Sequence, residues 1–99
     1  MTPPITPVPT RRVQVFELLN VTRLESLLVI TAEGEAAVHE RLRLARPPDL
    51  GTWDPAADDL SVQLLTPLLP PEAAEEFVKR YLANMRPRTW RYHVWRPDR

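Results

Sequence analysis

The pattern of apolar residues along this 99-residue chain predicts an α+β fold, in which two main helices pack on a small, mostly antiparallel sheet. Two strand-like stretches near the start are joined by a short polar connection, as in an antiparallel hairpin. Two further stretches have apolar residues at helical spacing, and each is followed by another strand-like stretch. The predicted order is therefore β-β-α-β-α-β, in a single domain that spans residues 11–99.

The first two predicted strands are Arg12–Leu19 and Leu27–Thr31. The first alternates apolar with polar residues, with Glu17 among the polar ones. The second contains aliphatic and β-branched residues and no charge, which predicts a strand covered on both faces. The polar connection Val21–Glu25 predicts that the two strands form a hairpin.

A helix is predicted directly after the second strand. Thr31 is the expected N-cap, and Glu33 lies near the start, where a carboxylate favours the helix dipole. Gly34 is expected to weaken this first turn by roughly 1 kcal/mol relative to alanine. Apolar residues then recur at helical spacing, and Pro47-Pro48 ends the helix.

The second half of the chain predicts a strand, a helix and a final strand. Leu60–Thr66 is the strand, and Pro67 either limits it to a sheet edge or ends it. Pro70-Pro71 opens a helix in which apolar residues recur at helical spacing along one side, and Pro87 ends it. On its other side, pairs at i,i+4 spacing are expected between Glu75 and Lys79 and between Glu76 and Arg80. The alternation in Thr89–Trp95 predicts the last strand.

Composition and sequence signals narrow the kinds of site and location. The absence of cysteine excludes disulfides and thiolate metal sites, and two histidines are too few for a histidine-built metal centre. No apolar run reaches the roughly 20 residues that span a membrane, and the start of the chain lacks signal-peptide features. We therefore expect a cytoplasmic protein without a cofactor and without a membrane partner. Residues 1–10, with four prolines, predict a flexible, polyproline-like arm; a PxxP ligand role for it is the less favoured alternative.

The loop at residues 47–59 is rich in proline and aspartate. Aspartates are common in turns because they bond to their own backbone, and a divalent-cation site is the less favoured alternative. Trp53 is expected to pack over the core edge, although a stacking face is the other interpretation.

Charge is unevenly distributed, although the net charge is zero. Residues 1–78 carry six arginines and twelve carboxylates, whereas residues 79–99 carry seven basic residues and one aspartate. This asymmetry indicates either an anionic partner for the basic end or pairing of that end with the acidic body. In the first interpretation Arg86, Arg88, Arg91 and Arg96 contact phosphates, and Trp90, Tyr92 and Trp95 stack on bases.

Three features together resemble a known family. Val13–Leu18 is followed by the segment LLVIT at residues 27–31, which runs into a helix, and Ala73 precedes Glu76 by three residues in the later helix. Residues 13–84 in this order resemble the GIY-YIG endonuclease module of homing and excision-repair nucleases. The resemblance implies that two tyrosines organise a nucleophilic water, an arginine stabilises the phosphate and a glutamate binds the metal.

Most of the implied active site is missing from this chain. Phe16 is the single aromatic residue in the first motif, Leu27 replaces the second tyrosine, and the helix arginine falls at Ala37, with Arg41 one turn later. Glu76 alone remains, at the family's metal position. A phosphodiesterase needs metal and charge stabilisation together, so we expect little catalysis, and residual metal-dependent nuclease activity is the least favoured alternative.

Two functions remain after this comparison. The first is a non-catalytic, degenerate GIY-YIG-like domain that binds nucleic acid through its basic and aromatic C-terminal stretch. The alternative is a small protein-interaction domain that forms a homodimer through its last strand or through exposed aromatic residues. In either case Glu76 is interpreted as an ordinary residue of the first helical turn, paired with Arg80.

Overall fold

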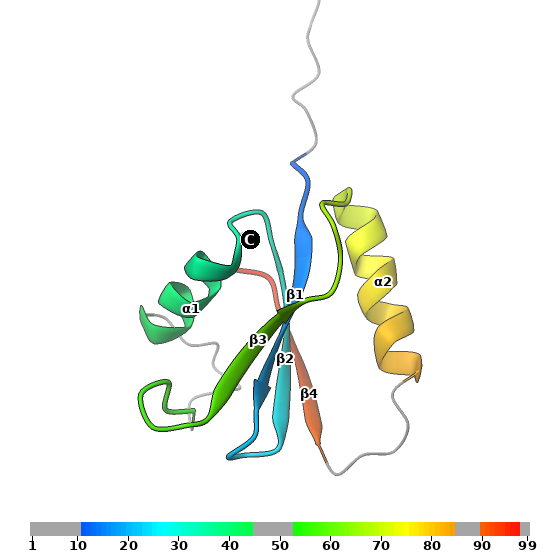
Figure 1. Cartoon of the computed structure of the whole chain (residues 1–99). Helices are drawn as coiled ribbons and strands as arrows, with labels where there is room; N and C mark the ends of the chain where they lie inside the picture. The colour runs from blue at the N-terminus through cyan, green and yellow to red at the C-terminus, as the bar shows by residue number, and fades with distance from the viewer. Residues whose placement is uncertain (1–10, 45–52, 85–89, 98–99) are drawn as a thin grey trace, which may run out of the picture.

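The order of elements predicted from the sequence is confirmed in the computed structural model, which describes residues 11–44, 53–84 and 90–97 (Figure 1). The proline-rich arm predicted for residues 1–10 lies outside the described residues. The elements are β1 (Gln14–Asn20), β2 (Glu25–Thr31), α1 (Glu35–Leu44), β3 (Leu60–Leu64), α2 (Pro71–Asn84) and β4 (Arg91–Trp95). Within this part of the chain, neither helix has the length and apolar character that a membrane crossing requires.

The four strands form one mixed sheet in the order β3-β1-β2-β4. β1 pairs antiparallel with β2, as predicted for the hairpin, and also antiparallel with β3. β4 pairs parallel with β2. The parallel pairing follows from the connections, because a helix between two strands returns the chain in the same direction. β2, β3 and β4 therefore share one direction, and β3 and β4 form the two edges of the sheet.

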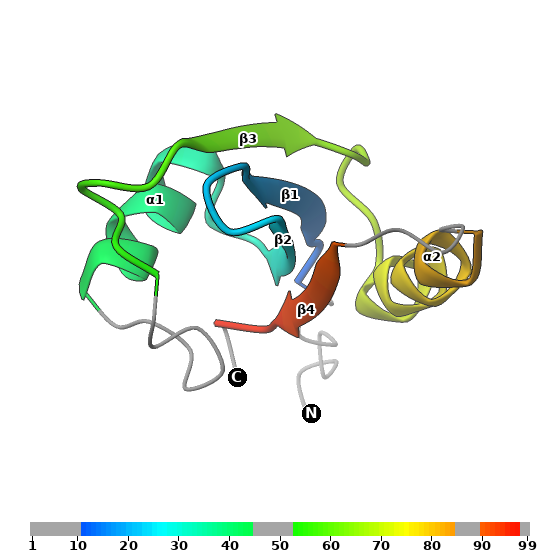
Figure 2. The same ribbon diagram turned by 90° about the horizontal axis from the view of Figure 1, so that it is seen from below.

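The two helices cover opposite faces of the sheet, so the domain has three layers (Figures 1 and 2). One core lies between the sheet and α1 and includes the fully buried Trp53. The other lies between the sheet and α2. Alternate residues of β1 and β2 contribute to the two cores, which is why β2 carries apolar side chains at nearly every position: the α1 core contains Phe16, Leu18, Leu27, Val29, Val38 and Leu42, and the α2 core contains Val13, Val15, Leu28, Ile30, Ala74 and Val78.

The start of α1 differs from the prediction. Its first turn is closed by the Val38 backbone N–H, which donates to the Gly34 carbonyl at 3.2 Å, and Gly34 has a φ of 90°. Thr31 instead accepts a bond from the Glu33 backbone N–H at 3.2 Å, in a tight turn ahead of the helix. Thr31 is therefore not the N-cap. Gly34 is needed at this position because the left-handed backbone is strained for residues with a side chain.

Candidate functional site

The two described arginines that were predicted to bind phosphate, Arg91 and Arg96, lie on opposite faces of the sheet. Arg86 and Arg88 lie outside the described residues. Arg91 is exposed and makes no ion pair with any described residue, and its pairing with Glu25 in the sheet places it on the α1 face. Arg96 instead donates two bonds of 2.6 Å to the Glu75 carboxylate of α2, on the other face. This contact raises the pKa of the Arg96 guanidinium above its usual value.

The Arg96–Glu75 pair corrects one expectation and supports another. Glu75 bonds to Arg96 rather than to Lys79, because β4 passes beside α2 at this point. Part of the basic end therefore pairs with the acidic body, which was one of the two interpretations of the charge asymmetry. The three aromatic residues expected to stack on bases, Trp90, Tyr92 and Trp95, are all half-buried, and Trp95 packs against the α1 core.

The positions that the nuclease resemblance singles out lie on two sides of the sheet. Phe16 and Leu27 are buried in the α1 core, and Ala37 lies on α1 itself. Glu76 lies on α2, over the opposite face, where it accepts a bond of 3.1 Å from Arg80. The pair with Arg80 is the one expected from helical spacing. The structure therefore does not bring the remaining glutamate together with the other motif positions.

A buried carboxylate that the sequence analysis missed lies under α2. Glu17 of β1 is 3% exposed and accepts three hydrogen bonds from uncharged donors. The donors are Ser26 Oγ at 2.8 Å, Gln63 Nε2 at 2.9 Å and the Tyr81 hydroxyl at 2.8 Å. We call Glu17 and these three donors the Glu17 cluster. It joins β1, β2, β3 and α2 in one network.

The alternation in β1 contained a signal for this burial. Val13 and Val15 share a face with Glu17, whereas Phe16 and Leu18 lie on the other face. A strand with apolar residues on both faces is covered on both, so its polar residue is buried as well. The sequence analysis named Glu17 only as a polar residue of this alternation and gave it no role.

A second carboxylate joins β4 to the rest of the sheet on the α1 face. Glu25 Oε2 accepts a bond of 2.7 Å from Trp53 Nε1 and lies 3.1 Å from His93 Nε2. Trp53 is fully buried, which confirms the packing interpretation. Next to it, the Leu24 carbonyl accepts a bond of 3.1 Å from the Arg91 N–H. These contacts fix the start of β4 against the β1–β2 turn.

The aspartate-rich segment ahead of β3 acts as a turn. Asp58 Oδ2 accepts bonds from Asn20 Nδ2 at 2.9 Å, Arg23 Nε at 2.8 Å and the Asp54 backbone N–H at 3.0 Å. These contacts, with the Asn20 bond the largest contributor, lower the pKa of the Asp58 carboxyl to about 2. No group of three or more potential metal-ligating side chains occurs among the described residues; Asp49 of this segment lies outside them.

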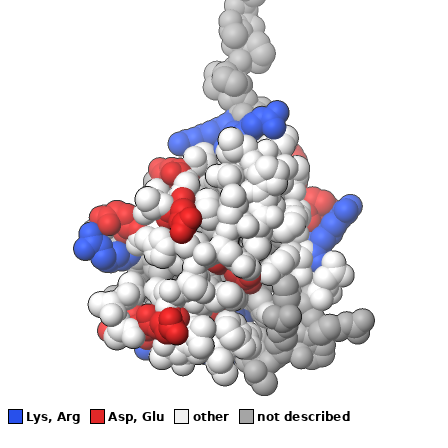
Figure 3. Space-filling model, in the orientation of Figure 1, with Lys and Arg blue, Asp and Glu red and all other residues white. Residues whose placement is uncertain are grey.

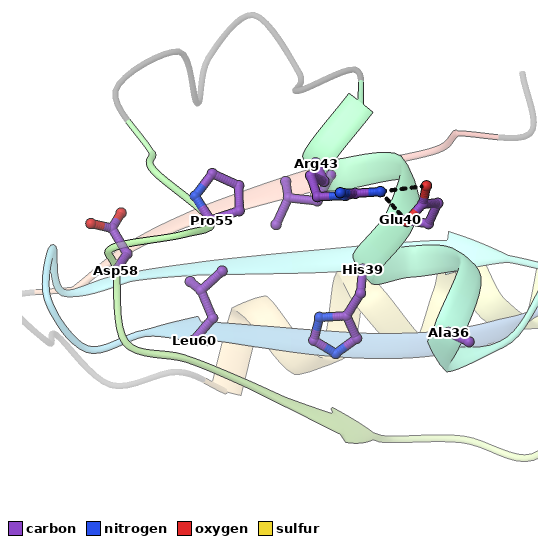
Figure 4. A pocket seen from close by; sticks show the side chains of 8 residues that line it. Ala36, His39, Glu40, Arg43, Pro55, Asp58 and Leu60 are labelled. Carbon is purple, nitrogen blue, oxygen red and sulfur yellow. Dashed lines mark hydrogen bonds and ion pairs between the residues drawn. The ribbon is translucent and has the colours of Figure 1, made fainter.

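The described residues line two hollows, one on each side of the sheet. One, of about 330 Å³, separates α1 from the segment ahead of β3 (Figure 4). Figure 4 shows Arg43 turned toward Glu40, to which it donates bonds of 2.9 and 3.0 Å. Asp58 accepts the bonds from Asn20, Arg23 and Asp54 described above. The other hollow, of about 610 Å³, lies between α2 and β4 and is bridged by the Arg96–Glu75 pair. No serine or threonine is among the described residues that line either hollow.

The edge strand β3 differs from the other edge, β4, in its charge. Residues 60–64 contain no charged side chain, and Leu64 is 52% exposed, as is Leu68 beyond the strand. Figure 3 views the molecule from the β3 side and shows charged side chains mainly around the margin of this face. We call β3 with Leu68 the β3 edge.

Comparison with protein-family models, curated proteins and solved structures found no match for this chain. The α+β fold class therefore rests on the elements and pairings described above. The GIY-YIG resemblance stays a prediction from the residue pattern.

Proposed function

We propose that this chain is a non-catalytic binding domain that recognises a protein partner through its β3 edge. The observation that carries the proposal is an edge strand without a charged side chain, with half-exposed leucines at Leu64 in the strand and at Leu68 beyond it. An open strand offers unpaired backbone N–H and C=O groups, and a second strand satisfies them by extending the sheet. Charged side chains on an edge normally prevent such pairing, and β3 has none.

The geometry around Glu76 supports the non-catalytic part of the proposal. Its carboxylate is paired with Arg80 on the exposed side of α2, and the other motif positions lie in the α1 core. A metal-assisted phosphodiesterase requires its ligands and charge-stabilising groups around one reacting phosphate. We therefore infer a degenerate GIY-YIG-like domain retained for binding.

The experiment that tests the proposal is a titration of the isotope-labelled domain with a synthetic peptide of residues 60–66, flanked by lysines for solubility. We expect backbone amide shifts concentrated in β3, because a strand added there contacts β3 first. Leu64→Lys is expected to abolish them, since it places a charge on the edge. Val21→Lys is the matched control, because Val21 is 50% exposed but lies in the β1–β2 turn. Absent shifts, or shifts away from β3, would remove the β3 edge as a binding surface.

Nucleic-acid binding is the second candidate, and the observation in its favour is the exposed Arg91 without an ion pair among the described residues. The test is fluorescence anisotropy of labelled oligonucleotides at several salt concentrations. If Arg91 contacts a phosphate, Arg91→Ala weakens binding similarly for all sequences and lowers the salt slope by about 1. Arg96→Ala is the matched control, because Arg96 is already paired with Glu75. Equal affinities for the wild type and Arg91→Ala would exclude Arg91 from such an interface.

A further inference from the structure

We infer that the partner of the β3 edge is a second copy of this chain, joined by antiparallel pairing of β3 with β3 around a two-fold axis at Val62. The inference rests on the proposed function and identifies the partner. It also moves the homodimer contact from the last strand, where the sequence analysis placed it, to the opposite edge of the sheet.

The backbone of β3 determines which residues meet the partner. The Leu65 N–H donates to the Val15 carbonyl of β1 at 2.9 Å, and the Asp59 carbonyl accepts from Val21 at 3.0 Å. Backbone groups in an antiparallel strand point alternately to one side and the other. The odd-numbered residues of this segment therefore bond toward β1. The N–H and C=O groups of the even-numbered residues, which are Leu60, Val62 and Leu64, point outward.

These three residues are complementary to themselves. Antiparallel pairing around Val62 places Val62 opposite its copy and Leu60 opposite the copy's Leu64, so that every outward backbone group at these positions has a partner. Their side chains share the α1 face, because Leu60 and Val62 pack against that core and Leu64 pairs with Phe16. The half-exposed Leu64 is then covered by an apolar neighbour, and no like charges face each other.

The other edge lacks this complementarity. β4 begins at Arg91, contains His93, and is followed by Arg96 and Pro97. Charge and proline are the usual means by which an edge strand avoids a second sheet. β3 has them only outside the paired residues, at Asp59 and Pro67, whereas β4 itself begins with Arg91. A second copy is thus expected to extend the sheet at β3 and leave β4 at the two outer ends.

The inference is tested by sedimentation of the full chain over a wide concentration range, together with cross-linking. The chain has no cysteine, so Val62→Cys introduces a single thiol. Directly opposed residues in an antiparallel pair have Cα atoms about 5.5 Å apart, which a disulfide can bridge. We expect a dimer that Leu64→Lys dissociates, that Val21→Lys leaves intact, and that Val62→Cys links covalently on mild oxidation. Cysteine at Val21 is the cross-linking control and is expected to stay unlinked.

Other outcomes separate the inference from the function on which it rests. A monomer at every concentration that still binds the peptide at β3 overturns the second copy and leaves the β3 edge as a binding surface. A monomer that fails to bind the peptide overturns both. A dimer that persists in Leu64→Lys, or that Val62→Cys does not link, overturns the β3 pairing.

Discussion

The two edges of the sheet are held in different ways. β4 is tied by ionisable side chains, with His93 bonded to Glu25 and Arg96 bonded to Glu75. β3 is anchored from within by an uncharged amide, because Gln63 donates to the buried Glu17. Residues 60–64 of β3 carry no charged side chain, whereas β4 begins with Arg91 and is followed by Arg96. The comparison teaches that the two edge strands of one sheet can differ in how open they are to pairing.

The largest expected effect comes from removing the contacts that hold β4 in the sheet. Trp53→Ala removes a fully buried indole from the α1 core and the N–H bond to Glu25, which also holds His93. We expect a loss of about 3–5 kcal/mol in the free energy of unfolding, measured by urea denaturation. Hydrogen exchange should rise more at β4 than at β3.

Trp95→Ala is the matched control for Trp53→Ala. Trp95 packs against the same core from β4 but is only partly buried, so its removal should cost less. An equal or larger loss in Trp95→Ala would mean that β4 is held by packing rather than by the Glu25 contacts.

The next largest effect comes from weakening the Glu17 cluster, which anchors β3 through Gln63. Tyr81→Phe removes one of the three donors to Glu17 and leaves a buried carboxylate short of a hydrogen bond. We expect a loss of about 1–3 kcal/mol in the free energy of unfolding. In the double variant Glu17→Leu with Tyr81→Phe, the loss should be smaller than the sum of the single losses, because the two groups lose the same contact. Strict additivity would show that Tyr81 does not stabilise Glu17.

The smallest expected effect is on the pH dependence of stability, through Asp58 in the segment ahead of β3. Contacts to Asn20, Asp54 and Arg23 hold the pKa of Asp58 at about 2, below its ordinary 3.8. A lowered carboxyl pKa contributes stability that is present above the ordinary value and is lost as the pH falls toward about 2. We therefore expect the melting temperature of Asp58→Asn to fall less steeply than that of the wild type between these pH values. Parallel melting curves in the two proteins would contradict the assignment.

Local patterns predicted most of the elements. The hairpin and both helices follow from apolar spacing, turn composition and proline positions, and these depend on neighbours in the chain, although the predicted Thr31 cap was wrong. The burial of Trp53 follows from the general tendency of tryptophan to pack. Strand ends shifted by a few residues, with β3 ending at Leu64 instead of Thr66. Gly34 was judged by helix propensity alone, although its φ of 90° is what the turn before α1 requires.

Contacts between distant residues could not be predicted in this way. The parallel pairing of β4 with β2 depends on which faces the two helices cover, and therefore on the whole topology. The Tyr81 hydroxyl donates a hydrogen bond to Glu17, and the two residues are 64 positions apart in the chain. His93 contacts Glu25, and these residues are 68 positions apart. For the candidate site, the sequence pattern drew attention to the basic end. The uncharged character of β3 became informative only once its place at the edge was known.

The pairing of β4 with β2 has a consequence for the order of synthesis. β2 lies in the middle of the finished sheet, yet its neighbour on one side is made only after α1, β3 and α2. A ribosome that adds about 5–20 residues per second needs several seconds for that interval. During it, the apolar β2 is an open edge and β3 can already be paired with β1. The strand most exposed to wrong association in the nascent chain is therefore β2, which β4 covers in the folded protein.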